Sequence, residues 1–467
     1  MPLWILSRRS SKSRSSRSRT KRVLMSSQRV KLISLGCSKN LVDSEHLLRQ
    51  IAESGVEIVP AEAPYSADHA LDVVVINTCG FIADAKEESV NTILEAVEAK
   101  RLGMVSKILV FGCLSQRYRE ELIKEIPEVD GFFGAFESRE VLRAMGIPFK
   151  KSLCRQRYLT TPKHYAYLKI SEGCNRHCAY CAIPGMRGKH ISEPIEELVE
   201  EAKNLAAEGV KELIIIAQDI TYYGLDLYGK RSLGRLLKEL CRVEGIEWIR
   251  LHYSYPASFP KDVIAIMASE PKICKYMDIP LQHSSTKVLK AMKRGVDAKR
   301  TQELIDAFRK ALPGITLRTT MMVGFPGEDA REFAKLMEFV RRNRFDRLGA
   351  FTYSEEEGTY AAEHYKDSVR AATKERRYAA LMQLQSSISL ENNSRRIGTQ
   401  ERVIVDSCSV GEGVWIARSR SESPEVDGII KVAIPKGFSK PAQLVGSFME
   451  VKITGADEYD LEAEMIL

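Results

Sequence analysis

The stretch Ser171–Gly188, SEGCNRHCAYCAIPGMRG, holds three cysteines in a C-x3-C-x2-C arrangement, Cys174, Cys178 and Cys181. A structural zinc site takes four protein ligands, and a disulfide framework uses an even number of cysteines. Three thiolates within eight residues instead predict a metal site with one position left open. Because cysteine is the usual ligand of a [4Fe–4S] cluster, three of its irons could be held here and the fourth left free. Zinc is the alternative.

A second group of three cysteines lies near the start of the chain, in KLISLGC, LDVVVINTCGF and KILVFGCL. Each of these apolar runs predicts a strand, and the strands alternate with amphipathic segments such as NLVDSEHLLRQIAESG. This alternation favours a parallel, doubly wound sheet, whose ligands bind beyond the carboxyl ends of its strands. Cys37, Cys79 and Cys113 all lie at that end. A lone cysteine is usually a small buried hydrophobe, but three at matching positions predict a second site.

Further strands and helices alternate from Tyr165 to about Asn393. The predicted strands are YAYLKIS, KELIIIAQD, WIRLHYSYP, YMDIPLQH, ITLRTTMMVGFPG and RLGAFTYS. They predict a complete or partial (β/α) barrel with its function at the carboxyl ends of the strands, and C-x3-C-x2-C directly follows the first of them. From Gln400 to Leu467, short strands punctuated by Gly and Pro predict a small β-barrel.

These patterns divide the 467 residues into a basic tail (1–28), an N-terminal domain (29–150), a central domain (160–398) and a C-terminal domain (399–467). The first 24 residues hold eight Lys and Arg and no acid, so the net charge of +8 comes from them. They could be a transit peptide, an RNA-binding arm, or sequence upstream of a true start at Met25. Ten cysteines without a secretory signal predict reduced thiols and a cytoplasmic protein, and no apolar run could span a bilayer.

The C-x3-C-x2-C set, with EGC before it and Tyr180 inside it, resembles the radical S-adenosylmethionine (SAM) superfamily. The resemblance implies that the free iron binds the amino and carboxylate groups of SAM. One electron then cleaves SAM to methionine and a 5′-deoxyadenosyl radical. With the first cysteine set and the terminal module, the chain from Lys31 onward resembles the methylthiotransferases of that superfamily. This implies a second [4Fe–4S] cluster on Cys37, Cys79 and Cys113 that carries the sulfur, and a terminal TRAM domain.

Contacts to SAM beyond the cysteines are predicted at three polar residues. Gln218 and Asp219 end the strand IIIAQD, and Arg318 in LRTT could pair with the methionine carboxylate of SAM. The alternative for each is an ordinary polar residue at a strand end. GFPGE, residues 324–328, lacks the Lys-Ser/Thr of a phosphate-binding loop and is interpreted as a turn. No catalytic side chain is assigned, because the clusters and SAM would carry the chemistry.

Methylthiotransferases modify either an adenosine of tRNA or an aspartate of ribosomal protein S-twelve. Residues 400–467 hold twelve acidic and seven basic side chains, a net of −5, which favours a basic protein over RNA. YYGLDLYG (222–229), FTYSEEEGTYAA (351–362) and ARSRSESPEVDG (417–428) resemble segments of the S-twelve type. The resemblance therefore implies methylthiolation of an aspartate β-carbon. Glu193, where the family usually has Arg, and Asp329, where it usually has Thr, depart from the pattern without touching a cysteine.

Two other functions stay open at this point, a tRNA adenosine methylthiotransferase and a non-catalytic iron–sulfur adaptor for RNA or the ribosome. The expected partners are ribosomal protein S-twelve and an electron donor of the flavodoxin or ferredoxin type. Direct nucleic-acid binding is not expected to be the main mode, and no membrane partner is expected. The chain is expected to be a monomer. Cys154, Cys241, Cys274 and Cys408 have no partner pattern and are interpreted as packing residues.

Overall fold

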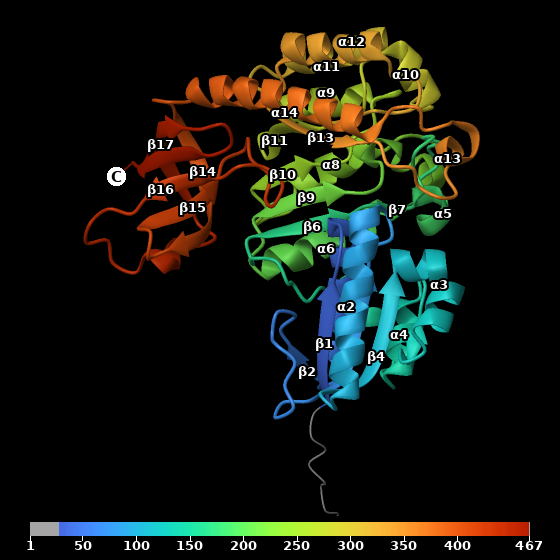
Figure 1. Ribbon diagram of the computed structural model, residues 1–467. Helices are drawn as coiled ribbons and strands as arrows, with labels where there is room; N and C mark the ends of the chain where they lie inside the picture. The colour runs from blue at the N-terminus through green and yellow to red at the C-terminus, as the bar shows by residue number, and fades with distance from the viewer. Residues whose placement is uncertain (1–27, 467) are drawn as a thin grey trace, which may run out of the picture.

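The computed structural model describes residues 28–466, and Figure 1 shows three units along the chain. The N-terminal domain lies below the central domain in this view, and the small C-terminal barrel packs against the side of the central domain. The basic tail lies outside the described residues. None of the helices in the described part is long and apolar enough to cross a membrane.

The N-terminal domain is a five-stranded parallel sheet in the order β2-β1-β3-β4-β5, with helices on both faces. Its elements are β1 (Arg29–Ser34), α1 (Ser38–Ala52), β2 (Glu57–Val59), β3 (Leu71–Thr78), α2 (Ala83–Arg101), β4 (Val105–Gly112), α3 (Cys113–Glu125), β5 (Gly131–Phe132) and α4 (Ser138–Ala144). One core cluster joins the sheet to α2 and α3, and a second joins it to α1 and α4. The doubly wound sheet predicted from the sequence is thus confirmed. The run LDVVVINT is almost wholly buried, as a strand covered on both faces should be.

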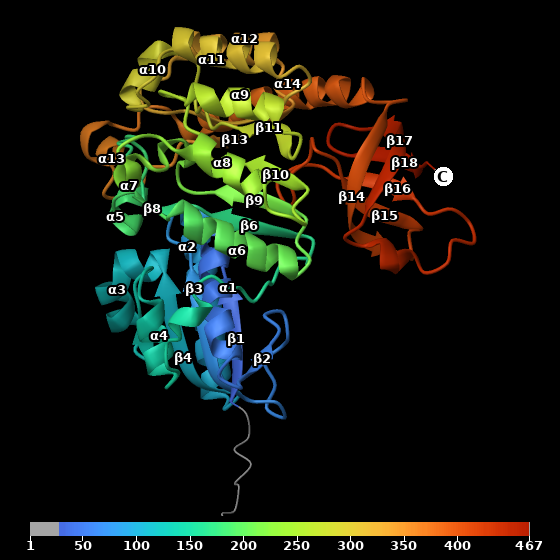
Figure 2. The ribbon, with the colours of Figure 1, turned by 180° about the vertical axis from the view of Figure 1, so that it is seen from behind.

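The central domain is an open, six-stranded parallel sheet in the order β13-β12-β11-β10-β9-β6, which confirms a partial barrel. Its strands are β6 (Tyr165–Lys169), β9 (Glu212–Ile216), β10 (Trp248–Leu251), β11 (Ile273–Asp278), β12 (Thr316–Val323) and β13 (Arg347–Thr352). Its helices are α5 (Ile183–Arg187), α6 (Ile195–Ala207), α7 (Leu225–Tyr228), α8 (Leu233–Cys241), α9 (Lys261–Ser269), α10 (Thr286–Ala291), α11 (Ala298–Ala311), α12 (Ala330–Asn343), α13 (Tyr360–His364) and α14 (Ala371–Ser394). Figure 2 shows α6, α8, α9 and α11 covering the outer face of this sheet.

Short elements that the sequence pattern did not predict complete this part of the chain. They are the two-stranded ribbon of β7 (Ser171–Glu172) and β8 (Ile191–Ser192), and the 3-10 turns η1 (Lys151–Leu153) and η2 (Ile220–Tyr222). The ribbon closes the loop that carries the C-x3-C-x2-C set. It thereby fixes both ends of the cysteine loop at the carboxyl end of β6.

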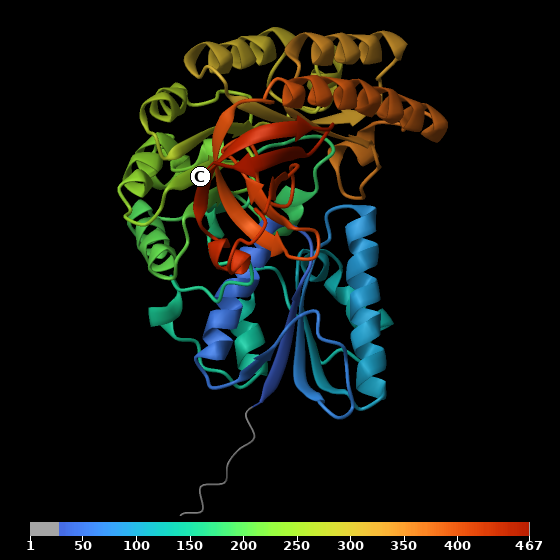
Figure 3. The ribbon, with the colours of Figure 1, turned by 90° about the vertical axis from the view of Figure 1, so that its left-hand side faces the viewer.

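The C-terminal domain is a closed five-stranded barrel, as predicted. Its strands follow the order β14-β15-β16-β18-β17. They are β14 (Gln400–Ser409), β15 (Val414–Arg418), β16 (Ile430–Ala433), β17 (Phe448–Ala456) and β18 (Leu461–Met465), with η3 (Pro441–Leu444) between β16 and β17. Figure 3 looks onto this barrel from its outer side, with the central domain behind it.

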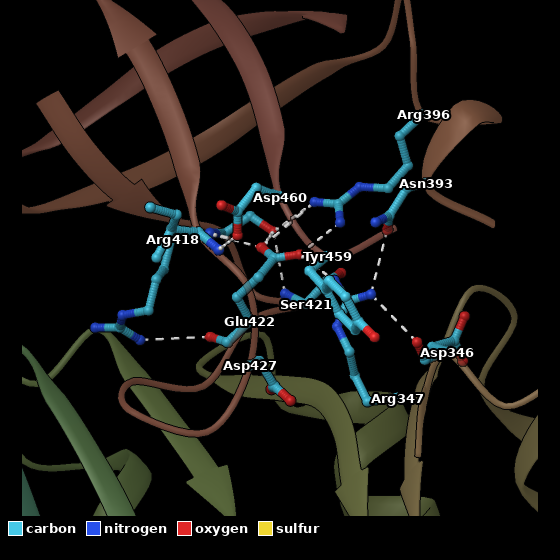
Figure 4. A network of polar contacts seen from close by, with 12 residues as sticks. Asp346, Arg347, Asn393, Arg396, Arg418, Ser421, Glu422, Asp427, Tyr459 and Asp460 are labelled. Atoms are coloured by element: carbon cyan, nitrogen blue, oxygen red, sulfur yellow. Dashed lines mark hydrogen bonds and ion pairs between the residues drawn. The ribbon is translucent and has the colours of Figure 1, made fainter. Parts of the chain in front are cut away.

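The loop between β15 and β16 joins the barrel to β6, β11 and β13 of the central sheet. Glu425 accepts hydrogen bonds from Tyr165 Oη at 3.1 Å and from Tyr167 Oη at 2.9 Å, both on β6. Tyr276 Oη on β11 donates to Asp427 at 2.7 Å. Glu422 pairs with Arg347 of β13 at 3.0 Å (Figure 4). The segment SESPEVDG is therefore a partly buried contact between domains, and part of the barrel's acidic excess is neutralised there.

Candidate metal centre between the first two domains

The first cysteine set gathers where three parallel strands end. Cys37 precedes α1, Cys79 follows β3, and Cys113 opens α3. Burial, and to a smaller extent the neighbouring thiols of Cys37 and Cys113, raise the pKa of Cys79 to about 11. Gly36 makes this approach possible: its φ is +86°, and a Cβ there would lie 2.6 Å from the Cys79 Cβ. The three thiols are thus close enough to influence one another's ionisation.

The second cysteine set lies in the loop between β7 and α5. Burial, and to a smaller extent the thiols of Cys178 and Cys174, raise the pKa of Cys181 to about 12. Arg176 N–H donates to Cys174 Sγ at 3.4 Å, and the Ala179 N–H donates to the Met292 carbonyl at 2.9 Å. The backbone of the loop therefore contacts one of its own thiols, and a hydrogen bond to the residue that follows α10 holds the loop in place.

One cavity of about 390 Å³ faces both cysteine sets. Residues from the N-terminal and central domains line it: Cys37, Lys39, Cys79, Phe81, Cys113, Cys181, Ile183, Arg187, Gln218, Tyr253, Ser254, Tyr255, Pro280, Gln282 and Arg294. The carboxyl ends of two separate parallel sheets meet here, which is where both sheets are expected to bind ligands. Four of the six cysteines line this cavity, Cys37, Cys79 and Cys113 of the first set and Cys181 of the second, although up to 144 positions separate them in the sequence.

Guanidinium groups approach a thiol of each set. Arg187 Nε donates to Cys113 Sγ at 3.1 Å, and Arg294 Nη1 donates to Cys178 Sγ at 3.3 Å. A neighbouring arginine favours the thiolate form that metal binding requires. Sulfur-only donor sets suit iron–sulfur clusters, whereas a single zinc ion needs ligands that converge on one point. Among residues 28–466, no group of three or more His, Cys, Asp or Glu side chains is arranged to hold a single ion. Each donor set consists of thiols alone, which fits an iron–sulfur cluster.

A buried network of charges holds the two domains together beside the cavity. Arg187 Nη1 contacts Asp43 of α1 at 2.9 Å and Glu172 at 3.1 Å. Lys169 pairs with the same two carboxylates. Burial opposes ionisation of Glu172, but Lys169 and Arg187 outweigh it and lower its pKa to about 2. These contacts fix the orientation of the first cysteine set relative to the second.

The three predicted SAM contacts have different positions. Gln218 lines the cavity and donates from Nε2 to Glu172 Oε1 at 2.5 Å. Asp219 is buried, pairs with Arg176 at 2.8 Å and caps the η2 turn, so it supports the cysteine loop from the side. Arg318 lies elsewhere, in the cavity between the central sheet and the C-terminal barrel. Its guanidinium is bound by Asp278 at 2.8 Å and approaches Asp427 at 3.5 Å, so its position does not support a contact with SAM.

Several residues of the site were not predicted from the sequence. Tyr253 and Gln282 line the cavity with φ values of +61° and +72°, a conformation that residues other than glycine adopt rarely and that often occurs at functional sites. The Lys39 ammonium lies 3.3 Å from the centre of the Tyr253 ring. Lys39 and Arg187 are buried cations that follow cysteines closely in the sequence. Lys39 comes two positions after Cys37 and Arg187 six positions after Cys181, and this proximity was the available signal.

Two buried amide oxygens in the cavity have no partner within the described part of the chain. They are Oε1 of Gln218 and Oε1 of Gln282. A buried polar atom without a hydrogen bond is costly unless a ligand or water satisfies it. Both oxygens therefore fit a ligand that presents hydrogen-bond donors, such as the hydroxyl and amino groups of SAM.

Three family models match the chain. The Radical SAM superfamily matches residues 168–340, an uncharacterized protein family, UPF0004, matches residues 29–134, and the TRAM domain matches residues 397–466. The solved structure of the radical SAM methyltransferase TsrM from Kitasatospora setae, with cobalamin and a [4Fe–4S] cluster bound, is 14% identical. It matches with a TM-score of 0.52 over 90% of this chain and 85% of that one, which shows a shared fold.

Curated proteins resemble the chain over almost its whole length. The protein named ribosomal protein uS12 methylthiotransferase RimO from Bacteroides thetaiotaomicron is 50% identical over 95% of this chain and 99% of its own. Proteins of the same name from Cytophaga hutchinsonii and Flavobacterium psychrophilum are each 50% identical, over 94% and 93% of this chain and 98% of their own.

Proposed function

The chain belongs to the RimO family of ribosomal protein uS12 methylthiotransferases, and we propose that the cavity between its first two domains is where an aspartate of uS12 receives the methylthio group. The chain is a radical SAM enzyme that methylthiolates uS12 and uses SAM and [4Fe–4S] clusters. One observation carries the placement of the reaction: cysteines of both sets line one cavity. Radical and sulfur must meet at one carbon atom, so their sources have to face one space.

Each cysteine set holds one cluster in this proposal. Cys37, Cys79 and Cys113 hold the cluster that carries sulfur, and Cys174, Cys178 and Cys181 hold the cluster that binds SAM. When bound, the clusters supply the electron that cleaves SAM and the iron that holds the transferred sulfur. The chain itself supplies three thiolates at each site, and Arg187 and Arg294 favour their ionised form.

Polar residues of the cavity orient SAM. The free amide oxygens of Gln218 and Gln282 accept hydrogen bonds from its hydroxyl or amino groups. Asp219 acts indirectly, because its carboxylate fixes Arg176 in the cysteine loop. Arg318 has no role in SAM binding in this proposal. SAM is used twice, once as methyl donor to the sulfur and once as the source of the 5′-deoxyadenosyl radical.

Apolar side chains in the wall of the cavity limit the access of water to the reacting groups. The 5′-deoxyadenosyl radical would take a hydrogen atom from the β-carbon of the uS12 aspartate and become 5′-deoxyadenosine. The β-carbon would then form a C–S bond to the methylated sulfur at the first site while the bond between that sulfur and its carrier breaks, and the remaining electron would pass to the first cluster, which gives a 3-methylthioaspartate. The cavity is mostly apolar around its polar contacts, with Phe81, Ile183 and Pro280 in its wall. Such a wall suits radical chemistry, because it contributes few groups that could react with the radical.

The remaining assignments follow from this function. An electron donor of the flavodoxin or ferredoxin type supplies the reducing electron, and the enzyme acts as a monomer in the cytoplasm, where ribosomal proteins are assembled. The N-terminal domain spans residues 29–150, the radical SAM domain 160–398 and the TRAM domain 399–467. The family models, which match 29–134, 168–340 and 397–466, support this division.

The test is an anaerobic reaction of the reconstituted full-length protein with SAM and dithionite. Ribosomal protein uS12 and unmodified tRNA are offered in parallel and analysed by mass spectrometry. The proposal predicts one methylthio group on an aspartate of uS12. The same group on a tRNA adenosine would overturn the substrate assignment while leaving the cysteine assignment in place. Formation of no 5′-deoxyadenosine would contradict the radical mechanism.

A further inference from the structure

The segment Thr286–Arg300, which contains α10 and leads into α11, covers the outer side of the second cysteine set. Its Arg294 side chain contacts Cys178 Sγ at 3.3 Å, and the Met292 carbonyl accepts from the Ala179 N–H at 2.9 Å. Tyr255 Oη donates to the Arg294 carbonyl at 2.6 Å and lies 3.7 Å from Cys178 Sγ. Both through its side chains and through its backbone, the segment reaches from the protein surface to the cysteine loop.

The outward side of this segment is strongly basic. Thr286–Arg300 holds six Lys and Arg and one acid, whereas residues 25–467 as a whole are formally neutral. Five of the basic side chains are exposed: Lys287, Lys290, Lys293, Lys299 and Arg300. Lys287 pairs with Asp329 at 3.0 Å, and Lys299 approaches Glu303 at 3.9 Å.

The other three exposed cations surround one shallow hollow of about 300 Å³. Lys290, Lys293 and Arg300 line it with Asp297, whose carboxylate caps α11 through the Arg300 N–H at 2.8 Å. Within the described part of the chain, none of these three cations forms an ion pair, and Lys293 lies over the ring of Tyr360. Unpaired cations around a hollow attract the carboxylates of an acidic partner.

We propose that the Thr286–Arg300 face is the docking surface for an acidic one-electron carrier protein that reduces the centre at Cys174, Cys178 and Cys181. This inference rests on the proposed function, since cleavage of SAM consumes one electron. The carrier loses that electron, and the bond between the sulfonium and C5′ of SAM breaks to give methionine and the 5′-deoxyadenosyl radical. The carrier must approach closely, because electron transfer between proteins falls steeply with distance.

The direction of approach follows from what surrounds the cysteine loop. SAM and uS12 occupy the cavity on its inner side. In Figures 1 and 2, α10 lies with α5 and α13 at the same end of the central domain, on the outside of the loop. An RNA backbone could also bind a basic face, but it would have no need of the direct contact between Arg294 and Cys178. That contact favours a redox partner.

The test uses reduced flavodoxin, an acidic flavin protein, as the probe. A variant carrying Lys290→Glu, Lys293→Glu and Arg300→Glu is compared with the wild type for 5′-deoxyadenosine formation. With flavodoxin at low ionic strength, the variant should need about tenfold or more flavodoxin for half-maximal rate. With dithionite, a small reductant that needs no docking, both proteins should react within about twofold of each other. A control with Lys203→Glu, Lys238→Glu and Lys452→Glu, three exposed lysines elsewhere, should behave as wild type with both reductants.

A second readout does not depend on turnover. Carbodiimide joins lysine amines directly to carboxylates, so cross-links between the full-length protein and oxidised flavodoxin should map to Lys290 and Lys293 and disappear in high salt. The proposal would be overturned if the triple charge-reversal variant lost as much 5′-deoxyadenosine formation with dithionite as with flavodoxin, because that would indicate a structural role. It would also be overturned if the variant cleaved SAM normally with dithionite but failed to modify uS12, because that would indicate a role in substrate binding. Unchanged dependence on flavodoxin, or cross-links confined to other faces, would also overturn it. Absence of 5′-deoxyadenosine from wild type with dithionite would instead count against the proposed function.

Discussion

Arg187 Nε of the central domain lies 3.1 Å from Sγ of Cys113 in the N-terminal domain. Arg187 ends α5, six positions after Cys181, so one short segment carries a thiol of the second set and a contact to the first. The same guanidinium binds Asp43 and Glu172. Arg187 therefore connects the loop of the second cysteine set to the first cysteine set through a hydrogen bond and ion pairs.

Arg187→Met should destabilise the protein and the first cluster together. Removing one partner of a buried ion network leaves carboxylates uncompensated, which costs about 3–5 kcal/mol in the free energy of unfolding. Iron per chain should fall by about half. Arg187→Lys keeps the charge but not the planar fork, so an intermediate loss is expected. Iron analysis with urea unfolding of both variants checks this. A Met variant with full iron content and full methylthiolation would show that the contact is dispensable.

Removal of the first cysteine set should separate the two halves of the reaction. The triple variant Cys37→Ala, Cys79→Ala and Cys113→Ala is expected to hold about four irons in place of about eight. It should still cleave SAM to 5′-deoxyadenosine but should not methylthiolate uS12. The matched control replaces the half-buried Cys154, Cys241 and Cys408 by Ala and should keep both activities. Loss of SAM cleavage in the first variant with intact folding would contradict the assignment.

Gly36→Ala tests how tightly the first set is packed. The new Cβ would lie 2.8 Å from Cys79 Sγ, so the thiol must move and the first cluster should be lost. Gly55→Ala is the control, because Gly55 has a similar φ of +78° but open space around its Cβ position. Only the backbone penalty of about 1 kcal/mol is expected there. Iron content and uS12 modification of the two variants should therefore differ; equal iron in both would refute the packing argument.

Glu422 should make stability depend on pH at the C-terminal barrel. Burial opposes its ionisation, but Arg396 and Arg347 outweigh burial and lower its pKa from 4.5 to about 2. Because the folded pKa is the lower one, this stabilisation is present above about pH 4.5 and is lost as the pH falls toward 2. The loss is at most about 3 kcal/mol.

The measurement compares wild type with Glu422→Gln by urea unfolding at pH 6 and pH 3, followed by Trp248 and Trp415 fluorescence. Trp415 lies in the barrel core and Trp248 packs against Ile404 and Phe448 of the barrel. The free energy of unfolding should fall more in the wild type than in the variant between pH 6 and pH 3. Other acid-sensitive groups are the same in both proteins, so their effect cancels in the comparison. An identical pH dependence would show that Glu422 does not contribute.

Much of the fold could be predicted because its strands are continuous apolar runs separated by amphipathic helices. The grouping of Cys37, Cys79 and Cys113 followed from the same pattern, since β1, β3 and β4 are parallel strands of one sheet. The second cysteine set follows β6, which is parallel to β9 in the other sheet. The short ribbon of β7 and β8 could not be predicted, because a strand of two residues is too short to show a hydrophobic period. The ribbon forms only when the two ends of the cysteine loop come together in the fold.

The direction of a side chain does not follow from the sequence pattern. Arg318 lies in a central strand, which favours a contact with SAM, but its side chain is bound by Asp278 and Asp427 near the C-terminal barrel, so the structure offers no support for that prediction. The hydrophobic pattern of the sequence locates a residue on a strand, but it does not show which side chains or which cavity that residue contacts. Likewise the acidic excess of residues 400–467 was treated as available to a partner, although Glu422 and Asp427 are buried against the central domain.

The central claim is that radical and sulfur meet at one aspartate carbon in the cavity lined by both cysteine sets. The most direct measurement uses uS12 whose aspartates carry deuterium at the β-carbon, in an anaerobic reaction with SAM and dithionite. Mass spectrometry of the 5′-deoxyadenosine and of uS12 is then compared. We predict that deuterium appears in 5′-deoxyadenosine in proportion to the methylthio groups gained by uS12. Methylthiolated uS12 that forms with unlabelled 5′-deoxyadenosine would contradict this account.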